Sequence, residues 1–188
     1  MKLVNLPNLL TLLRIILIPV FITYMLYGKV RIAVCMFIMA AITDVLDGYV
    51  ARALNQRTDF GAFLDPIADK ILINSTFIIF AFNPNGITNG LIPLWFVITV
   101  ISRDFIIVFG YLFLFMLVGR VKVIPNIDGK ITALLQVGVI MLVLLHVLYP
   151  VACLPVYMRI LVVLTALFTI ISGIRYIWRG ITIINKNE

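Results

Sequence analysis

Six long apolar stretches separated by short turns restrict what this chain can fold into more than any other feature of its sequence. A helix needs about 20 predominantly apolar residues to cross the hydrocarbon core of a bilayer. Of the 188 residues, 63% are hydrophobic and only 12% are charged, whereas a soluble domain is about half apolar and a quarter charged. The sequence therefore predicts an all-α integral membrane protein, a six-transmembrane-helix bundle that forms a single membrane domain over residues 1–188.

Turn-forming residues divide the apolar stretches from one another. Tyr27-Gly28, the run Asn83-Pro-Asn-Gly86 and Pro150 punctuate the chain where helices should end. The expected spans are Asn8–Tyr27, Arg31–Leu54, Phe60–Phe82, Leu91–Val118, Gly129–Tyr149 and Pro155–Ile177.

Basic residues predict how the bundle is oriented. Cytoplasmic loops of membrane proteins carry an excess of Lys and Arg. If both termini are cytoplasmic, nine basic residues face inside: Lys2, Arg52, Arg57, Arg120, Lys122, Lys130, Arg175, Arg179 and Lys186. Three face outside: Lys29, Arg31 and Arg159. We therefore expect a protein of a bacterial-type cytoplasmic membrane with both termini inside. Its net charge of +7 is explained by anionic lipid without a nucleic acid partner.

Acidic residues are concentrated in one part of the chain. Only eight are present, and five of them fall within 26 residues: Asp59 and a cluster of four, Asp44, Asp47, Asp65 and Asp69. Ionisable residues within membrane segments are costly and mark functional sites. Carboxylates that lie together repel one another, and a divalent cation relieves that repulsion. The cluster predicts a cation site at the cytoplasmic ends of the second and third spans.

The spacing of the cluster places it on two helix faces. On the second span, positions i, i+3, i+4 and i+7 are Asp44, Asp47, Gly48 and Ala51, and on the third, positions i, i+4 and i+8 are Gly61, Asp65 and Asp69. Small residues on such faces let a backbone or a ligand come close. The alternative is a structural role, with the carboxylates paired to Arg52, Lys70 or Arg103. A cation transporter is the non-enzymatic alternative, although no inverted repeat or broken helix is visible.

The cluster resembles a known family signature. The pattern D-x2-D-G-x2-A-R-x8-G-x3-D-x3-D, from Asp44 to Asp69, is similar to that of the CDP-alcohol phosphotransferases. Asn8, Thr11 and Arg14 resemble the N-x2-[ST]-x2-R element of the branch that makes phosphatidylglycerophosphate and cardiolipin.

The resemblance implies transfer of a phosphatidyl group from CDP-diacylglycerol to an alcohol, with release of CMP. Asp44, Asp47 and Asp65 would coordinate two divalent ions, and Asp69 would be the general base and also contact metal. Hard oxygen ligands suit Mg²⁺ or Mn²⁺. The residues implied to bind CDP-diacylglycerol are Asn8, Thr11, Arg14, Asp44, Gly48, Ala51, Arg52 and Gly61. The family also implies a homodimer.

The acceptor alcohol is predicted from the fourth and fifth spans. Arg103 lies deep in the fourth span beside Asp104, and either that carboxylate or an anionic acceptor would be its partner. Relatives that use glycerol-3-phosphate carry a second arginine where this chain has Tyr111, and Ser102-Arg103-Asp104 is similar to the cardiolipin synthases. We therefore expect Arg103 and Lys130 to bind phosphatidylglycerol as the acceptor. The product would then be cardiolipin. The alternative acceptor is glycerol-3-phosphate, which makes phosphatidylglycerophosphate.

Overall fold

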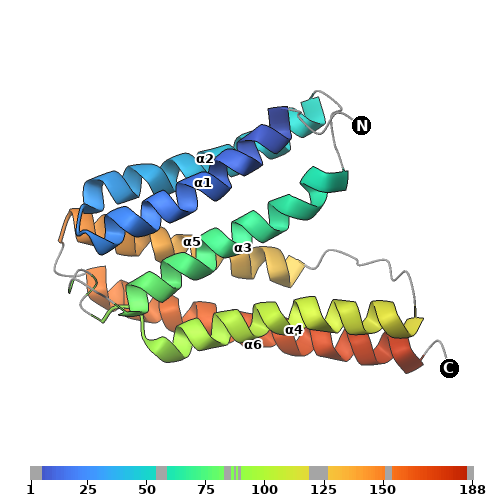
Figure 1. Ribbon diagram of the computed structural model, residues 1–188. Coiled ribbons are helices and arrows are strands. Elements are labelled where there is room, and N and C mark those ends of the chain that lie inside the picture. Colours follow the sequence, from blue (N-terminus) through green and yellow to red (C-terminus); the bar gives the residue numbers. More distant parts are fainter. Residues whose placement is uncertain are drawn as a thin grey trace. The chain divides into compact units, whose positions relative to one another are not determined.

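The computed structural model is all-helical over the part of the chain that it describes, which comprises residues 6–53, 59–82, 86, 88, 90–118, 127–150 and 154–185. These residues form six helices (Figure 1): α1 Leu6–Leu26, α2 Val30–Ala53, α3 Asp59–Phe82, α4 Leu94–Val118, α5 Ile127–Leu148 and α6 Leu154–Asn185. The predicted all-α fold is confirmed, and all but one of the helix ends lie within about three residues of the expected positions.

The exception is the end of α6, which was expected at Ile177 and lies at Asn185. The helix has 32 residues, and at 1.5 Å per residue it is about 48 Å long. It is therefore longer than the hydrocarbon core, which is about 30 Å thick. Arg175 lies just before the expected end of the span at Ile177, and Arg179 lies just beyond it.

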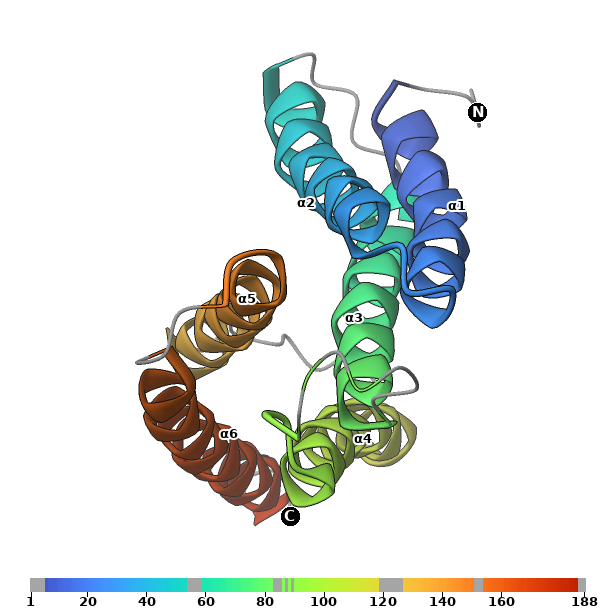
Figure 2. The same ribbon diagram turned by 90° about the vertical axis from the view of Figure 1, so that its left-hand side faces the viewer.

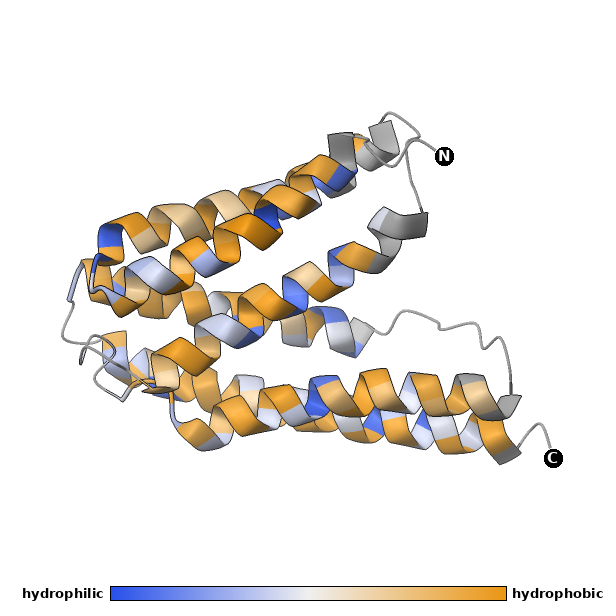
Figure 3. Cartoon of the chain, in the orientation of Figure 1, coloured by the Kyte–Doolittle hydropathy of each residue, from blue (hydrophilic) through white to orange (hydrophobic). Residues whose placement is uncertain are grey.

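Four of the described helices are long and apolar enough to cross a membrane, namely α1, α4, α5 and α6. Figure 3 shows apolar residues along most of their length. Helices α2 and α3 contain the aspartate cluster, and these charged residues lower their mean hydropathy. The expected count of six spans is therefore not confirmed.

The chain divides into two compact units. The first contains Met1–Asn89 with Val147–Tyr149, and the second contains Gly90–His146 with Pro150–Glu188. The expectation of one domain over residues 1–188 stays a prediction.

In the first unit, α1 packs along α2 and also contacts α3 (Figure 2). A turn at Gly28 (φ 70°) reverses the chain between α1 and α2. The amides of Gly28 and Lys29 donate to the carbonyls of Met25 and Tyr24, which is the Schellman arrangement that commonly ends a helix. Phe21 and Phe37 then pack with their ring centroids 5.6 Å apart, so the two helices run antiparallel over one apolar core.

In the second unit, α4 packs against α6 in a parallel arrangement. Arg103 contacts Ser172, and eleven residues further along α4 the side chain of Leu114 lies 3.6 Å from the position that a Cβ of Gly180 would take. Contacts therefore advance in the same direction along both helices. Helix α5 adds its first turn to this unit, where Asp128 pairs with Arg175 of α6.

Candidate active site

Helix α1 presents a polar stripe toward the aspartates of the first unit. Asn8, Thr11 and Arg14 recur every three residues on the buried face of the helix, and their exposed fractions are 3%, 1% and 0%. The same face becomes apolar toward the end of the helix, where Phe21 is fully buried. The buried face of α1 is therefore polar in the first half of the helix and apolar in the second half.

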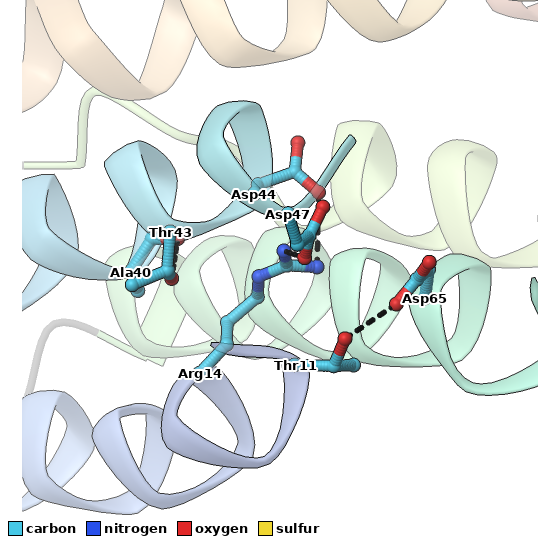
Figure 4. Close-up of polar contacts among 7 residues, drawn as sticks. All are labelled: Thr11, Arg14, Ala40, Thr43, Asp44, Asp47 and Asp65. Carbon is cyan, nitrogen blue, oxygen red and sulfur yellow. Dashed lines mark hydrogen bonds and ion pairs between the residues drawn. The ribbon is translucent and has the colours of Figure 1, made fainter. Parts of the chain in front are cut away.

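Arg14 connects α1 to two aspartates of α2 (Figure 4). Its Nη2 hydrogen-bonds Asp47 Oδ2, and its Nη1 lies 2.9 Å from Asp44 Oδ1. The side chains of Arg14 and Asp47 are 0% and 5% exposed, whereas that of Asp44 is 45% exposed. The i, i+3 spacing on α2 thus brings both carboxylates to one guanidinium, as the shared helix face predicted.

Thr11 makes the corresponding connection to α3. Its hydroxyl donates a hydrogen bond of 2.6 Å to Asp65 Oδ1, and Figure 4 shows this contact beside the Arg14 cluster. Asp69 lies one turn further along α3 and is partly buried. Helix α1 therefore touches carboxylates of both neighbouring helices, and Asp44, Asp47 and Asp65 are gathered around its polar stripe.

The chemistry of this group fits a hard divalent cation. All donors are carboxylate oxygens, and each aspartate keeps a second oxygen that the contacts to Arg14 and Thr11 do not use. Within the described part of the chain, no three His, Cys, Asp or Glu side chains come close enough to hold a metal ion by themselves. The guanidinium of Arg14 pairs with both α2 carboxylates instead.

The structural alternative for the cluster is partly realised, with a different cation. The sequence suggested Arg52, Lys70 or Arg103 as partners of the carboxylates. The structure instead pairs two of the carboxylates, Asp44 and Asp47, with Arg14. One guanidinium does not balance three carboxylates, so this pairing leaves the group negatively charged.

The remaining predicted residues of the first unit are placed in part. Gly61 is buried on α3. Gly48, Ala51 and Arg52 belong to the last turns of α2, but their surroundings lie outside the described residues. The contacts of Asn8, Thr11 and Arg14 with CDP-diacylglycerol stay predictions, and the structure gives Thr11 and Arg14 the role of holding aspartates.

A second polar cluster lies within the second unit. Arg103 donates from Nη1 to Asp104 Oδ1 at 2.9 Å and from Nη2 to Ser172 Oγ at 3.0 Å. The side chains of Arg103 and Asp104 are each 10% exposed. Arg103 Nε is buried and has no hydrogen-bond partner among the described residues. Arg103 can therefore pair with Asp104 and also bind an anionic acceptor, because the pairing with Asp104 does not use all of its N–H groups.

The first turn of α5 adjoins this cluster. A Cβ placed on Gly129 would lie 3.4 Å from Arg103 Nη2. The preceding residue, Asp128, accepts a hydrogen bond of 2.6 Å from Arg175 Nη1. Lys130 is exposed on the same turn. Two arginines from different helices therefore flank the N-terminus of α5, where the helix dipole also favours an anion.

Arg175 and Ser172 are the residues that sequence reasoning missed. Arg175 was read only as one of the basic residues that orient the bundle, although an arginine in an apolar helix could have been recognised as a functional candidate. Ser172 gave no signal, because a serine among apolar residues of a membrane helix is common.

The family model of the CDP-alcohol phosphatidyltransferases matches residues 4–171. The chain is 36% identical to the CDP-diacylglycerol–glycerol-3-phosphate 3-phosphatidyltransferase of Bacillus subtilis, over 92% of this chain and 93% of the relative. It is 35% identical to a probable phosphatidylglycerophosphate synthase of Mycobacterium tuberculosis, over 96% and 83% of the two chains. A relative from Aquifex aeolicus with the same name as the Bacillus protein is 31% identical over 97% and 99%.

The protein belongs to the CDP-alcohol phosphatidyltransferase family. It is an enzyme that transfers a phosphatidyl group from a CDP-diacylglycerol donor, as the signature from Asp44 to Asp69 predicted. Family membership and the four apolar helices together identify it as a membrane protein. The expectation of phosphatidylglycerol as the acceptor is not supported, because the relatives are named for glycerol-3-phosphate or for phosphatidylglycerophosphate.

Proposed function

We propose that the protein transfers the phosphatidyl group of CDP-diacylglycerol to glycerol-3-phosphate, which yields phosphatidylglycerophosphate and CMP. A hydroxyl oxygen of the acceptor forms a bond to the phosphorus that carries the diacylglycerol, and the bond from that phosphorus to the CMP oxygen breaks. The observation that carries this proposal is the similarity of nearly the whole chain to relatives named for this acceptor.

The second polar cluster supports a phosphomonoester acceptor. Glycerol-3-phosphate carries close to two negative charges near neutral pH, as phosphomonoesters do, and such a group favours more than one cation. Tyr111 supplies none. Arg175, however, reaches Asp128 on the turn of α5 that also adjoins Arg103. We infer that Arg175 of α6 replaces the cation that α4 lacks at position 111, together with Lys130 on the same turn of α5.

The first unit supports the donor half of the reaction. Asp44, Asp47, Asp65 and Asp69 would hold two divalent cations, Mg²⁺ or Mn²⁺. Bound there, the ions would neutralise the diphosphate of CDP-diacylglycerol and the leaving CMP oxygen. Arg14 and Thr11 orient the carboxylates, and Asp69 accepts the proton of the attacking hydroxyl. Gly48, Ala51 and Gly61 leave room for the cytidylyl group, and Arg52 contacts the diphosphate.

Product analysis tests the acceptor. Purified full-length protein is incubated with CDP-diacylglycerol and Mg²⁺, with glycerol-3-phosphate or phosphatidylglycerol at equal concentration. We expect phosphatidylglycerophosphate and CMP from the first acceptor. Cardiolipin from the second acceptor, with no phosphatidylglycerophosphate from the first, would overturn the proposal and restore the interpretation of Tyr111.

We also propose that both termini are cytoplasmic, that six helices span the membrane, and that the enzyme is a homodimer. The nine-to-three bias of basic residues supports the orientation. Cysteines introduced at positions 84 and 186, after replacement of Cys35 and Cys153, are labelled with an impermeant reagent in intact cells. Position 84 should react and position 186 should not. The reverse result would invert the topology. Cross-linking in native membranes tests the dimer.

A further inference from the structure

Arg103 is held in place by two side chains of different origin. Asp104 is its neighbour in sequence, whereas Ser172 comes from α6 and is 69 residues away. Each binds a different terminal nitrogen of the guanidinium, at 2.9 Å and 3.0 Å. Because a planar group that is fixed at two points cannot rotate within its plane, Ser172 decides in which direction the remaining N–H groups point.

Ser172 differs from the other hydroxyl groups of α6. The hydroxyls of Thr165, Thr169 and Thr182 donate to carbonyls four residues earlier on their own helix. This is the usual way in which a membrane helix satisfies such a group. Ser172 is 3% exposed and instead accepts a bond from the neighbouring helix. Its hydroxyl thus serves a contact that the helix itself does not need.

The packing of α4 on α6 brings Ser172 to the guanidinium. The next residue, Gly173, leaves space for the arginine stem, since a Cβ there would lie 3.5 Å from Arg103 Cγ. One turn further along α6, the ring of Tyr176 lies so close to α4 that a Cβ on Gly110 would be 2.9 Å from Cε1. Real Cβ atoms essentially never approach so closely, so glycine at position 110 allows the Tyr176 ring to pack against α4.

We propose that Ser172 is a positioning residue for the acceptor: it orients the Arg103 guanidinium so that its other N–H groups meet the phosphate of the acceptor. The proposal rests on the proposed function, in which Arg103 binds that phosphate. Ser172 acts through Arg103 and does not itself touch the reacting atoms. It should therefore affect how tightly the acceptor binds and leave the binding of CDP-diacylglycerol unchanged.

Steady-state kinetics of the full-length enzyme test this assignment. Ser172→Ala should raise KM for glycerol-3-phosphate about five- to tenfold, because one of the two contacts that orient the guanidinium is lost and the contact with Asp104 remains. KM for CDP-diacylglycerol should not change, and Ser172→Thr should restore the KM of the acceptor. Thr169→Val is the matched control, because Thr169 is fully buried on the same helix and bonds only its own backbone. It should leave both KM values as in the wild type.

A double-mutant cycle tests whether the effect passes through Arg103. In an Arg103→Lys background, Ser172→Ala should have little further effect on the KM of the acceptor. An unchanged KM in the Ser172→Ala single variant, or a full additional rise in the Arg103→Lys background, would overturn the assignment. So would a rise that Thr169→Val reproduces.

Two further measurements cover a variant that does not fold and an enzyme that uses the other acceptor. If Ser172→Ala does not give folded protein, Ser172→Cys takes its place, because a thiol keeps the volume but is a weak acceptor. The wild type is assayed with both candidate acceptors in parallel. If it makes no phosphatidylglycerophosphate, the proposed function fails, and the effect of Ser172→Ala is then measured on the acceptor that is used. An unchanged KM for that acceptor rejects the role of Ser172 separately.

Discussion

The two units each contain a buried arginine that pairs with aspartates, and the two arginines have opposite surroundings. Arg14 binds Asp44 and Asp47, and the third carboxylate of this group, Asp65, accepts a hydrogen bond from Thr11. Arg103 meets one carboxylate and one neutral hydroxyl, and a second arginine pairs nearby with Asp128. The first group keeps an excess of negative charge and suits cations. The second keeps donor groups and suits an anion.

This difference shows that an arginine–aspartate contact has no fixed meaning by itself. In either unit a salt bridge alone would have only a structural role. What distinguishes the two is which polar atoms remain unused after pairing. In the first unit these are carboxylate oxygens, and in the second they include the Nε of Arg103.

The carboxylates of the two units should differ most strongly in metal dependence. Asp47→Asn and Asp65→Asn should lower CMP release by about a thousandfold or more, because metal-assisted charge stabilisation is worth several kcal/mol. Asp104→Asn should keep the Mg²⁺ dependence of the wild type and lose acceptor affinity. CMP release is measured across a Mg²⁺ titration and in EDTA. Full activity of the wild type in chelator would remove the basis for the comparison.

Removal of the buried Arg14 should change both the stability of the protein and its response to Mg²⁺. Arg14→Ala leaves Asp47 buried beside Asp44 without a partner, which should cost about 3–5 kcal/mol. Mg²⁺ should then stabilise this variant more than it stabilises the wild type, because the competing cation is gone. Thermal unfolding in detergent with and without Mg²⁺ measures both effects. Arg159→Ala, an exposed cation on α6, is the control and should change stability by less than about 0.5 kcal/mol. Equal Mg²⁺ responses in all three proteins would argue against a cation site around Arg14.

Arg103 and Arg175 should divide acceptor binding unequally. Arg103→Ala should cost about 1.5–3 kcal/mol, or tenfold or more in kcat/KM for glycerol-3-phosphate, because a charge-assisted contact is lost at a buried site. Arg175→Ala should cost less, since its side chain is 58% exposed and water screens the charge. The measurement varies each substrate separately. A larger effect on CDP-diacylglycerol than on the acceptor would place these arginines in the donor half of the reaction.

The smallest effects concern two glycines that look alike in sequence. Gly110→Ala should destabilise the second unit by about 1–3 kcal/mol, because its Cβ would overlap the Tyr176 ring. Gly138→Ala should stabilise α5 by up to about 1 kcal/mol, since nothing lies within 4 Å of its Cβ and alanine is the better helix former. Thermal unfolding in detergent decides the sign of each change. Changes of the same sign would mean that the packing of the Tyr176 ring against α4 does not need glycine at position 110.

The helices and the aspartate faces could be predicted from the sequence. Helix positions follow from local apolar length and from turn residues such as Gly28, which explains why most ends were placed within about three residues. Asp44 and Asp47 share a face because helical spacing is fixed by 3.6 residues per turn. The end of α6 was misplaced, because Arg175 and Arg179 resemble residues that leave the membrane, although long basic side chains allow a helix to continue.

The partners of these faces were decided only by the tertiary structure. Arg14 meets Asp47 across 33 residues, Thr11 meets Asp65 across 54, Arg175 meets Asp128 across 47, and Arg103 meets Ser172 across 69. Helix formation is a local process, so spacing along the chain reveals which side chains share a face. Which faces meet depends on how closely two helices pack, and that is set by contacts such as Gly110 against Tyr176. By itself the sequence determined the family and its carboxylates, and the packing of the helices determined which distant side chains Asp47, Asp65 and Asp128 meet.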